Sequence, residues 1–214
     1  MAIKKTSKLK DRKILITAGP TWVNIDKVRV LSNTASGVTG MLLSGALAAK
    51  KSKVTLLLGP VGDFNIEKNI KLLRFKTFDE LKKTLVRELS LRSYDIVIHT
   101  AAVSDYRPQR IYSGKVASGI KGWKINLMPT EKIISLIKPI DESLFLVGFK
   151  FEPEAQKAKL ISKSRKLFRA GACDLVVANT VKKGCYAAYI LKSDKASGPM
   201  FSKKELVKKL VAVL

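Results

Sequence analysis

A short glycine-rich stretch, Ser36-Gly37-Val38-Thr39-Gly40, stands at the expected start of a helix and is the first part of the sequence that could bind a ligand. Glycines let backbone N–H groups approach an anion, and a helix N-terminus adds about half a positive charge. Asn33 lies three residues before Ser36 and offers a neutral amide with two donors and a carbonyl acceptor. These glycines suit the binding of a phosphate, although glycine at such a junction is often only structural.

A second set of candidate residues lies at the end of the later apolar run 94–102 and directly after it, in the order Ala101-Ala102-Val103-Ser104-Asp105. Small alanines let a flat ring or a reacting group lie against the backbone, although tight packing explains them equally well. The Asp105 carboxylate accepts hydrogen bonds from amino or hydroxyl groups. Ten residues further on, Lys115 lies in an irregular segment where a lid could carry a cation to a triphosphate, although by itself it is one lysine among many.

Residue counts exclude several kinds of catalysis. One histidine, His99, and two cysteines are too few for a histidine-rich metal site or a disulfide framework, and they predict a reducing, cytoplasmic setting. His99 lies within an apolar run, which disfavours a Ser-His-Asp triad. The glycine fingerprint of dinucleotide-binding folds and the phosphate-loop motif are absent, which argues against a dehydrogenase or an ordinary NTPase. The remaining possibility is catalysis that positions the reactants and neutralises their charge.

The charge balance is strongly basic, with 41 Lys+Arg against 17 Asp+Glu and a net charge of +24. Such a surplus attracts nucleic acids or phosphorylated small molecules. The positive residues are dispersed along the chain and aromatic residues make up only 7%, so specific nucleic-acid binding is disfavoured. No apolar run approaches the ~18–20 residues of a membrane span.

The elements that must position these residues follow from the apolar pattern. Continuous apolar runs predict buried strands at 13–19, 53–59, 70–75, 94–102, 143–149, 173–179 and 186–192. Helical spacing predicts helices at 38–50, 78–90, 154–170 and 203–214. Their alternation predicts an α/β fold in one domain, residues 1–214, with an open, mostly parallel sheet and helices on both faces. The weakly periodic segment 106–128 predicts an irregular flap. Ligands of such sheets bind at the carboxyl ends of the strands.

Five motifs in this order resemble the phosphopantothenate–cysteine ligase family. They are KILITAGPT (13–21), IDKVRVLSNTASGVTG (25–40), HTAAVSDYR (99–107) with a lysine ten residues beyond its aspartate, LVGF (146–149) and DLVVAN (174–179). Each motif alone is moderately specific for the family. Their joint order and spacing over residues 12–180 are strongly specific for it.

The resemblance implies a Rossmann-like homodimeric enzyme of coenzyme A biosynthesis that uses a nucleoside triphosphate and Mg²⁺. In that family, 4′-phosphopantothenate is activated as an acyl-nucleotide, and cysteine then displaces the nucleoside monophosphate to form 4′-phospho-N-pantothenoylcysteine. Bacterial members favour CTP and eukaryotic members ATP, and the motif set here predicts CTP. The chain is similar to a stand-alone ligase, with a separate flavin-dependent decarboxylase as an expected partner.

Site residues follow from motif position, and the resemblance assigns no metal ligand. It implies catalytic roles for Asn33, Lys115, Ala101 and Ala102, and nucleotide contacts for Gly19, Ser36, Gly37, Gly40, Asp105, Lys115, Phe149 and Asn179. The chain departs from the family pattern at Ala35, Ala117, Ser118, Lys150 and Thr180. These departures bear on nucleotide choice and turnover more than on the fold.

Two other classes of protein compete with the ligase interpretation. The high charge favours a basic α/β protein that binds nucleic acid or nucleotide without ligase activity, but the basic stretches carry no stacking motif. A short-chain reductase or epimerase would need the glycine fingerprint and a Tyr-x-x-x-Lys pair, and Tyr106 is followed by Arg110 instead.

Overall fold

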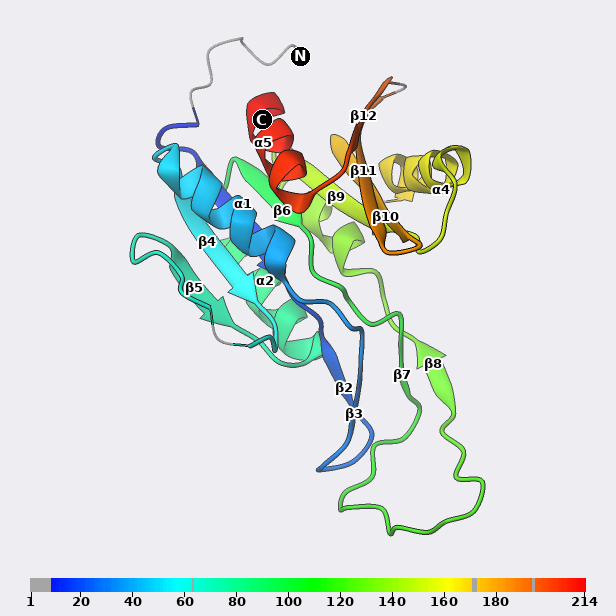
Figure 1. Cartoon of the computed structure of the whole chain (residues 1–214). Coiled ribbons are helices and arrows are strands. Elements are labelled where there is room, and N and C mark those ends of the chain that lie inside the picture. Colours follow the sequence, from blue (N-terminus) through cyan, green and yellow to red (C-terminus); the bar gives the residue numbers. More distant parts are fainter. Residues whose placement is uncertain (1–8, 63, 171–172, 194) are drawn as a thin grey trace.

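The computed structural model describes residues 9–62, 64–170, 173–193 and 195–214, and its centre is a twisted open sheet (Figure 1). In the described part of the chain the sheet has eight strands, in the spatial order β12 (Lys195–Met200), β11 (Cys185–Lys192), β10 (Leu175–Lys182), β9 (Phe145–Phe151), β6 (Ile96–His99), β1 (Lys13–Ala18), β4 (Lys53–Leu58) and β5 (Lys71–Arg74). From β5 to β10, neighbouring strands pair in parallel, whereas β11 pairs in the antiparallel direction with both β10 and β12. The α/β fold with a mostly parallel open sheet is therefore confirmed.

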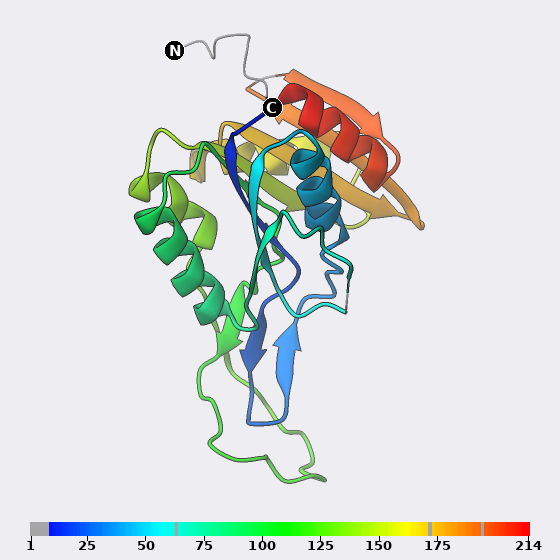
Figure 2. The same ribbon diagram turned by 90° about the vertical axis from the view of Figure 1, so that its left-hand side faces the viewer.

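Helices cover both faces of this sheet, as Figure 2 shows. One face carries α1 (Val38–Ala49) and α5 (Lys203–Val213); the other carries α2 (Phe78–Leu91), α3 (Ile137–Ile140) with the 3-10 turn Ile133–Leu136 before it, and α4 (Lys157–Ala170). Because both faces are covered, the parallel strands are apolar without alternation.

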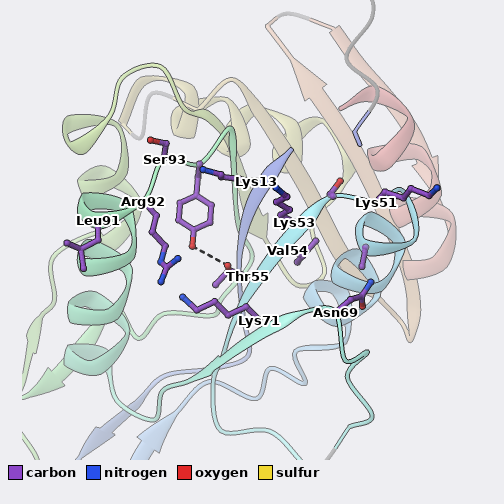
Figure 3. A pocket seen from close by; sticks show the side chains of 13 residues that line it. Lys13, Lys51, Lys53, Val54, Thr55, Asn69, Lys71, Leu91, Arg92 and Ser93 are labelled. Atoms are coloured by element: carbon purple, nitrogen blue, oxygen red, sulfur yellow. Dashed lines mark hydrogen bonds between the residues drawn. The ribbon is translucent and has the colours of Figure 1, made fainter. Parts of the chain in front are cut away.

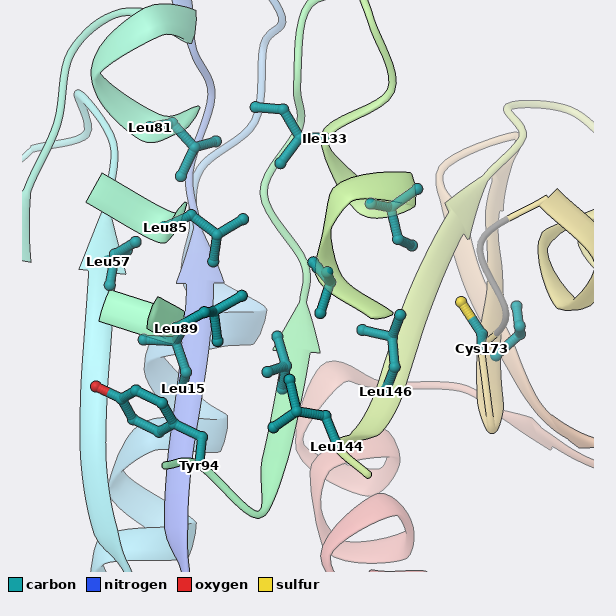
Figure 4. Packing of buried hydrophobic residues seen from close by; sticks show 14 of the residues in the cluster. Leu15, Leu57, Leu81, Leu85, Leu89, Tyr94, Ile133, Leu144, Leu146 and Cys173 are labelled. Carbon is teal, nitrogen blue, oxygen red and sulfur yellow. The ribbon is translucent and has the colours of Figure 1, made fainter. Parts of the chain in front are cut away.

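The core on the α2 face shows how the apolar pattern becomes packing. Leu81, Leu85 and Leu89 of α2 are spaced by four residues and pack against Leu15 of β1 and Leu57 of β4 (Figure 4). All five are buried, and burying one such side chain contributes about 1.5–3 kcal/mol. The helix begins in a capping box in which the Thr77 hydroxyl accepts from the backbone N–H of Glu80 and the Glu80 carboxylate accepts from the backbone N–H of Thr77.

Two small hairpins extend from the carboxyl edge of the sheet (Figures 1 and 2). The first pairs β2 (Trp22–Asn24) with β3 (Val30–Ser32), and the second pairs β7 (Tyr106–Pro108) with β8 (Leu127–Pro129). The long loop 109–126 between β7 and β8 matches the predicted flap. We call the two hairpins and this loop the arm.

Three features differ from the sequence-based expectation. β6 ends at His99, so Ala101 and Ala102 lie beyond the strand. The strand β12 was not expected, because its Gly198 and Pro199 disfavour a central strand, but β12 is an edge strand, where proline is tolerated. The three-residue strands of the arm are too short to produce a periodic pattern. In the residues that the structure describes, no helix is long and apolar enough to cross a membrane.

Candidate active site

The strand order reverses between β1 and β6, and we call the edge formed by the segments that follow these two strands the crevice. The chain runs from β1 outward to β4 and β5, and then returns to the other side of β1 as β6, so the direction of winding reverses there. In open α/β sheets, ligands bind at the carboxyl ends of the strands flanking this reversal. Gly19 follows β1 and Ala102 follows β6, and the backbone N–H of Ala102 donates to the carbonyl oxygen of Gly19 at 2.9 Å. Two residues predicted from separate motifs therefore meet at the crevice.

Asn33 lies against the alanine pair. Its Nδ2 group donates to the carbonyl oxygens of Ala102, at 3.1 Å, and Val103, at 3.2 Å. Two carbonyl acceptors fix the orientation of the amide, because only its NH₂ group can donate to them. The Asn33 Oδ1 atom has no hydrogen-bond partner in the described part of the chain, and the residue is exposed. Asn33 therefore presents an acceptor to a ligand, because the backbone engages its donor group.

The N-terminus of α1 approaches the same crevice. Gly37 caps the helix with φ of 72°, a left-handed conformation that favours glycine, and no side chain caps the first turn. A Cβ atom added to Gly40 would lie only 2.4 Å from the Cβ of Ala18, so only glycine allows this close contact with the end of β1. The first amides of a helix lack intrahelical acceptors. The loop from Ser36 to Gly40 therefore presents backbone donors beside the crevice.

Phe149 and Asn179 extend this edge to the next two strands. Phe149 of β9 pairs with Val177 of β10, and Asn179 lies two residues beyond Val177 on the same face. Phe149 is half-buried and packs against the core beneath α1 and α5. Both predicted nucleotide contacts thus lie on the face of the sheet that carries α1.

The single histidine holds the strand ends together. His99 Nδ1 lies 2.8 Å from the Thr17 hydroxyl oxygen, which also accepts from the backbone N–H of Ala101 at 3.3 Å. Burial lowers the pKa of His99 to about 4, so the ring is neutral at pH 7. This geometry agrees with the expectation that His99 is a packed residue.

Asp105 is joined to a cation that the sequence did not single out. Its carboxylate pairs with Lys132 at 2.5 Å, and both side chains are more than 60% exposed. The backbone N–H of Thr130 donates to the carbonyl oxygen of Asp105, and the Thr130 hydroxyl donates to that of Ser104. Lys132 therefore lies at the site entrance. In the sequence, residues 130–133 fall where members of the ligase family often place a nucleotide-binding turn, but the match is loose.

Lys115 is the predicted catalytic residue that does not join this cluster. Its neighbour Gly114 accepts a 3.4 Å hydrogen bond from the backbone N–H of Lys27, at the turn of the β2–β3 hairpin. Asn33 follows the opposite end of that hairpin, directly after Ser32. At ~3.3 Å per residue, the hairpin separates Lys115 from Asn33 by roughly 15 Å.

A buried carboxylate ties the flap to the hairpin. Asp26 accepts from the backbone amides of Val28, Arg29 and Val116 at 2.7–3.1 Å, and from the Arg29 guanidinium at 2.7 Å. Arg29 also donates to the carbonyl oxygen of Val116 and lies over the Trp123 ring. Burial alone raises the pKa of Asp26, but these hydrogen bonds and the Arg29 charge outweigh it and lower the pKa to about 2. Asp26 and Arg29 are positioning residues that sequence reasoning missed, although both lie in a recognised motif.

We expect Asp26→Asn to loosen the flap. The amide side chain lacks the charge that strengthens four hydrogen bonds, so hydrogen–deuterium exchange in residues 110–126 should accelerate about tenfold. In the unsubstituted chain the contribution of Asp26 is fully present above the ordinary aspartate pKa near 4 and is lost as the pH falls through about 2. Asp79→Asn, at an exposed position in α2, is the control. Unchanged exchange in the flap of Asp26→Asn would contradict the role of Asp26 in holding the flap to the hairpin.

Comparisons with known proteins show the family of this chain. Residues 9–214 match the family described as DNA/pantothenate metabolism flavoprotein C-terminal domain. The coenzyme A biosynthesis bifunctional protein CoaBC of Thermococcus kodakarensis is 36% identical over 176 residues, which cover 81% of this chain and 42% of that protein. The chain spans about half the length of the curated relatives it matches.

Solved structures show the same fold. The DNA/pantothenate metabolism flavoprotein from Streptococcus pneumoniae has a TM-score of 0.84 at 23% identity, covering 94% of this chain and 97% of that one. A Cab2 mutant in complex with phosphopantothenate-cysteine has a TM-score of 0.76 at 17% identity, covering 96% of this chain and 86% of that one.

The strand order and the crevice define a Rossmann-like α/β protein with a ligand edge between β1 and β6. The chain belongs to the family of the DNA/pantothenate metabolism flavoprotein C-terminal domain. The family resemblance carried by the five motifs is thereby confirmed.

Proposed function

We propose that this chain joins 4′-phosphopantothenate to L-cysteine through an acyl-nucleotide intermediate, acting as one ligase domain over residues 1–214 in coenzyme A biosynthesis in the cytoplasm. The observation that carries the proposal is the contact of the Asn33 amide with the carbonyl oxygens of Ala102 and Val103 at the crevice between β1 and β6. Family membership and the names of the curated relatives support it.

In the first step, a carboxylate oxygen of phosphopantothenate attacks the α-phosphorus of the nucleotide, and pyrophosphate leaves. The backbone amides at the start of α1 would bind the phosphates, and the cation of Lys132 would offset their charge. Phe149 and Asn179 would contact the rest of the nucleotide along the strand edge. No histidine is needed for this step, which fits the neutral, buried His99.

In the second step, the cysteine nitrogen attacks the acyl carbon, the nucleoside monophosphate leaves with the electrons of the broken C–O bond, and the amine gives up a proton to solvent. The unpartnered Oδ1 atom of Asn33 would accept a hydrogen bond from the attacking nitrogen and orient it. Because backbone carbonyls hold the amide, this acceptor is preorganised.

Magnesium would accompany the nucleotide. The described residues contain no group of three or more His, Cys, Asp or Glu side chains that could hold a metal ion. Mg²⁺ is commonly held by substrate phosphates with one or two carboxylates, so the exposed carboxylate of Asp105 fits as its protein contact. When bound, the ion would neutralise phosphate charge as pyrophosphate forms.

The arm suggests a homodimer. In the described part of the chain, exposed large apolar side chains gather on it, at Val28, Val30, Tyr106, Ile111, Ile120, Leu127 and Met128. Both hairpins are two-stranded and have unpaired edges, which favour pairing with another strand. We propose that two arms pair and that the flap of one protomer delivers Lys115 to the Asn33 cluster of the other, which would resolve the separation of roughly 15 Å within one chain.

A flavin-dependent decarboxylase is the expected protein partner. One relative, 37% identical over 175 residues, is named as a cysteine/cysteine sulfinic acid decarboxylase.

The competing proposal, a basic nucleic-acid-binding protein without ligase activity, rests on the net charge of +24. If the charge serves small anions, DNA should bind weakly and lose affinity steeply with salt.

We expect CTP to be the preferred nucleotide. The test is pyrophosphate release with phosphopantothenate and Mg²⁺, measured with CTP and with ATP, and with and without cysteine. A kcat/KM for CTP about tenfold above that for ATP is the expected result, corresponding to about 1.4 kcal/mol of differential transition-state binding. A preference for ATP would contradict the CTP assignment alone, whereas no release with either nucleotide would contradict the ligase proposal.

A further inference from the structure

A cavity lies at the opposite end of the sheet from the candidate active site. It has a volume of about 840 Å³ and opens at the amino ends of β1, β4 and β5, beside the end of α2 (Figure 3). Pockets for small ligands commonly measure about 300–1,000 Å³. None of the residues discussed for the ligase reaction lines it.

Cations dominate the walls of this cavity. Five of its thirteen lining residues are basic and none is acidic; the five are Lys13, Lys51, Lys53, Lys71 and Arg92. Three of them begin neighbouring strands, because β1 starts at Lys13, β4 at Lys53 and β5 at Lys71. The cavity is therefore built by the sheet and is not a random group of surface lysines.

The strand register turns these lysines toward one another. Lys13 pairs with Lys53, and Lys71 pairs with Thr55, two residues beyond Lys53. Side chains alternate between faces along a strand, so Lys13, Lys53 and Lys71 all point to the face that carries α2. Arg92 follows α2 and reaches the same space, as Figure 3 shows.

A buried carboxylate fixes two of the cations. Glu88 of α2 accepts from Lys71 at 2.8 Å, Arg92 at 3.2 Å and the Tyr94 hydroxyl at 2.8 Å, all through Oε2. The Tyr94 oxygen in turn accepts from the Thr55 hydroxyl at 3.2 Å, because its own proton is donated to Glu88. One carboxylate thus holds two cations in place beneath the cavity and leaves a positive charge uncompensated.

Among the described residues, the ammonium groups of the other pair of cations form no ion pair, although the Asp95 carboxylate, which pairs with Arg12, also accepts from the backbone N–H of Lys13. In the part of the chain that the structure describes, the ammonium groups of Lys13 and Lys53 have no hydrogen-bond or ion-pair partner. Their strands lie about 4.8 Å apart, and like charges directly opposite each other on neighbouring strands are destabilising. An anion bound between them would remove this repulsion.

We propose that this basic cavity binds a small ligand that carries two or more linked phosphate groups. A single phosphate would engage one cation pair, whereas linked phosphates span both the Lys13–Lys53 pair and the Lys71–Arg92 pair. Leu91, 74% exposed at the rim, offers an apolar contact to an organic group on the ligand. The proposal does not depend on the ligase activity.

The competing explanation is that these cations only complement the C-terminus of α2, where positive charge is favourable. The two explanations differ for Lys53→Gln. If the charge serves only the helix, this substitution lowers the melting temperature. If Lys53 repels Lys13 in the absence of an anion, the substitution raises or preserves the melting temperature without ligand and weakens anion binding.

The test uses inorganic triphosphate as the probe and site-resolved acylation of lysines, read by mass spectrometry. Triphosphate should slow the labelling of Lys13, Lys53 and Lys71 several-fold while leaving Lys208, exposed on α5, unaffected. In Lys53→Gln the triphosphate concentration needed to protect Lys13 and Lys71 should rise about tenfold, the effect of losing one charge-assisted contact. Lys208→Gln, which removes the same charge, is the matched control.

A second arm compares triphosphate with ATP and CTP. Protection at lower concentration by a nucleotide would identify a nucleoside polyphosphate as the ligand, and equal protection would identify the phosphate chain itself. The proposal is overturned if the cavity lysines are protected no more than Lys208. It is also overturned if Lys53→Gln lowers the melting temperature and leaves the protection of Lys13 and Lys71 unchanged.

Discussion

Asn33→Asp should reduce the formation of phosphopantothenoylcysteine by about 10²–10³-fold in a folded protein, the cost of losing one preorganised hydrogen-bonding group. Aspartate has nearly the shape of asparagine but cannot donate, so its carboxylate would face the carbonyl oxygens of Ala102 and Val103 without a hydrogen bond. The new charge would also repel the carboxylate substrate and the phosphates. The side chain should leave its position, and the acceptor that we assign to the second step would be misplaced.

The two half-reactions separate the roles of this residue. In a single-turnover quench that follows pyrophosphate and product in parallel, Asn33→Ala should slow product formation more than pyrophosphate release, because alanine removes the acceptor without adding charge. Asn33→Asp should impair both. Thr34→Ala, at the exposed neighbouring position, is the control. Normal product formation in both Asn33 variants would reduce the SNTASG loop to a structural turn.

Lys115→Ala should slow pyrophosphate release about 10²–10³-fold, with or without cysteine, because the family resemblance assigns Lys115 to the nucleotide and its cation would join that of Lys132 at the phosphates. Lys124→Ala, which removes an exposed lysine from the same flap, is the matched control. A nearly silent Lys115→Ala variant would show that Lys115 is an ordinary surface lysine. Lys121→Ala tests whether that residue substitutes for the lysines replaced by Ala117 and Ser118.

Mixing two inactive variants tests where Lys115 acts. If it serves the partner protomer, each heterodimer of Asn33→Ala and Lys115→Ala contains one site with neither substitution. Equal amounts that exchange subunits freely should then recover about a quarter of the activity of the unsubstituted dimer. If Lys115 folds back onto its own chain, every site carries one substitution and nothing is recovered. The second outcome would contradict delivery in trans, and a monomeric protein would contradict the dimer itself.

The sequence by itself predicted the α/β fold and most of its elements. β1 and β4 are continuous apolar runs because both of their faces are covered, and α2 carries leucines at helical spacing because one of its faces packs on the sheet. Such signals are local, so they are visible without knowledge of the partners. Strands that break the local rules were missed, as the Gly198-Pro199 pair in β12 illustrates.

Motif order also indicated the family and predicted a set of site residues, and the structure brings several of these residues together. Gly19, Asn33 and Ala102 meet at the crevice. No hydrogen bond joins Lys115 to them in the described part of the chain, and the tie between Asp26 and Val116 holds the flap beside the turn of the hairpin.

What only the tertiary structure decided is which distant groups meet and which atoms remain free. Asn33 and Ala102 are 69 residues apart, and Asp26 and Val116 are 90 residues apart. Their contacts depend on the crossover from β5 to β6 and on the docking of the flap, which no local period encodes. In the same way, Lys13 and Lys53 are ordinary strand-starting lysines in the sequence, and it is the parallel register of β1 and β4 that opposes their charges and makes a cavity for anions.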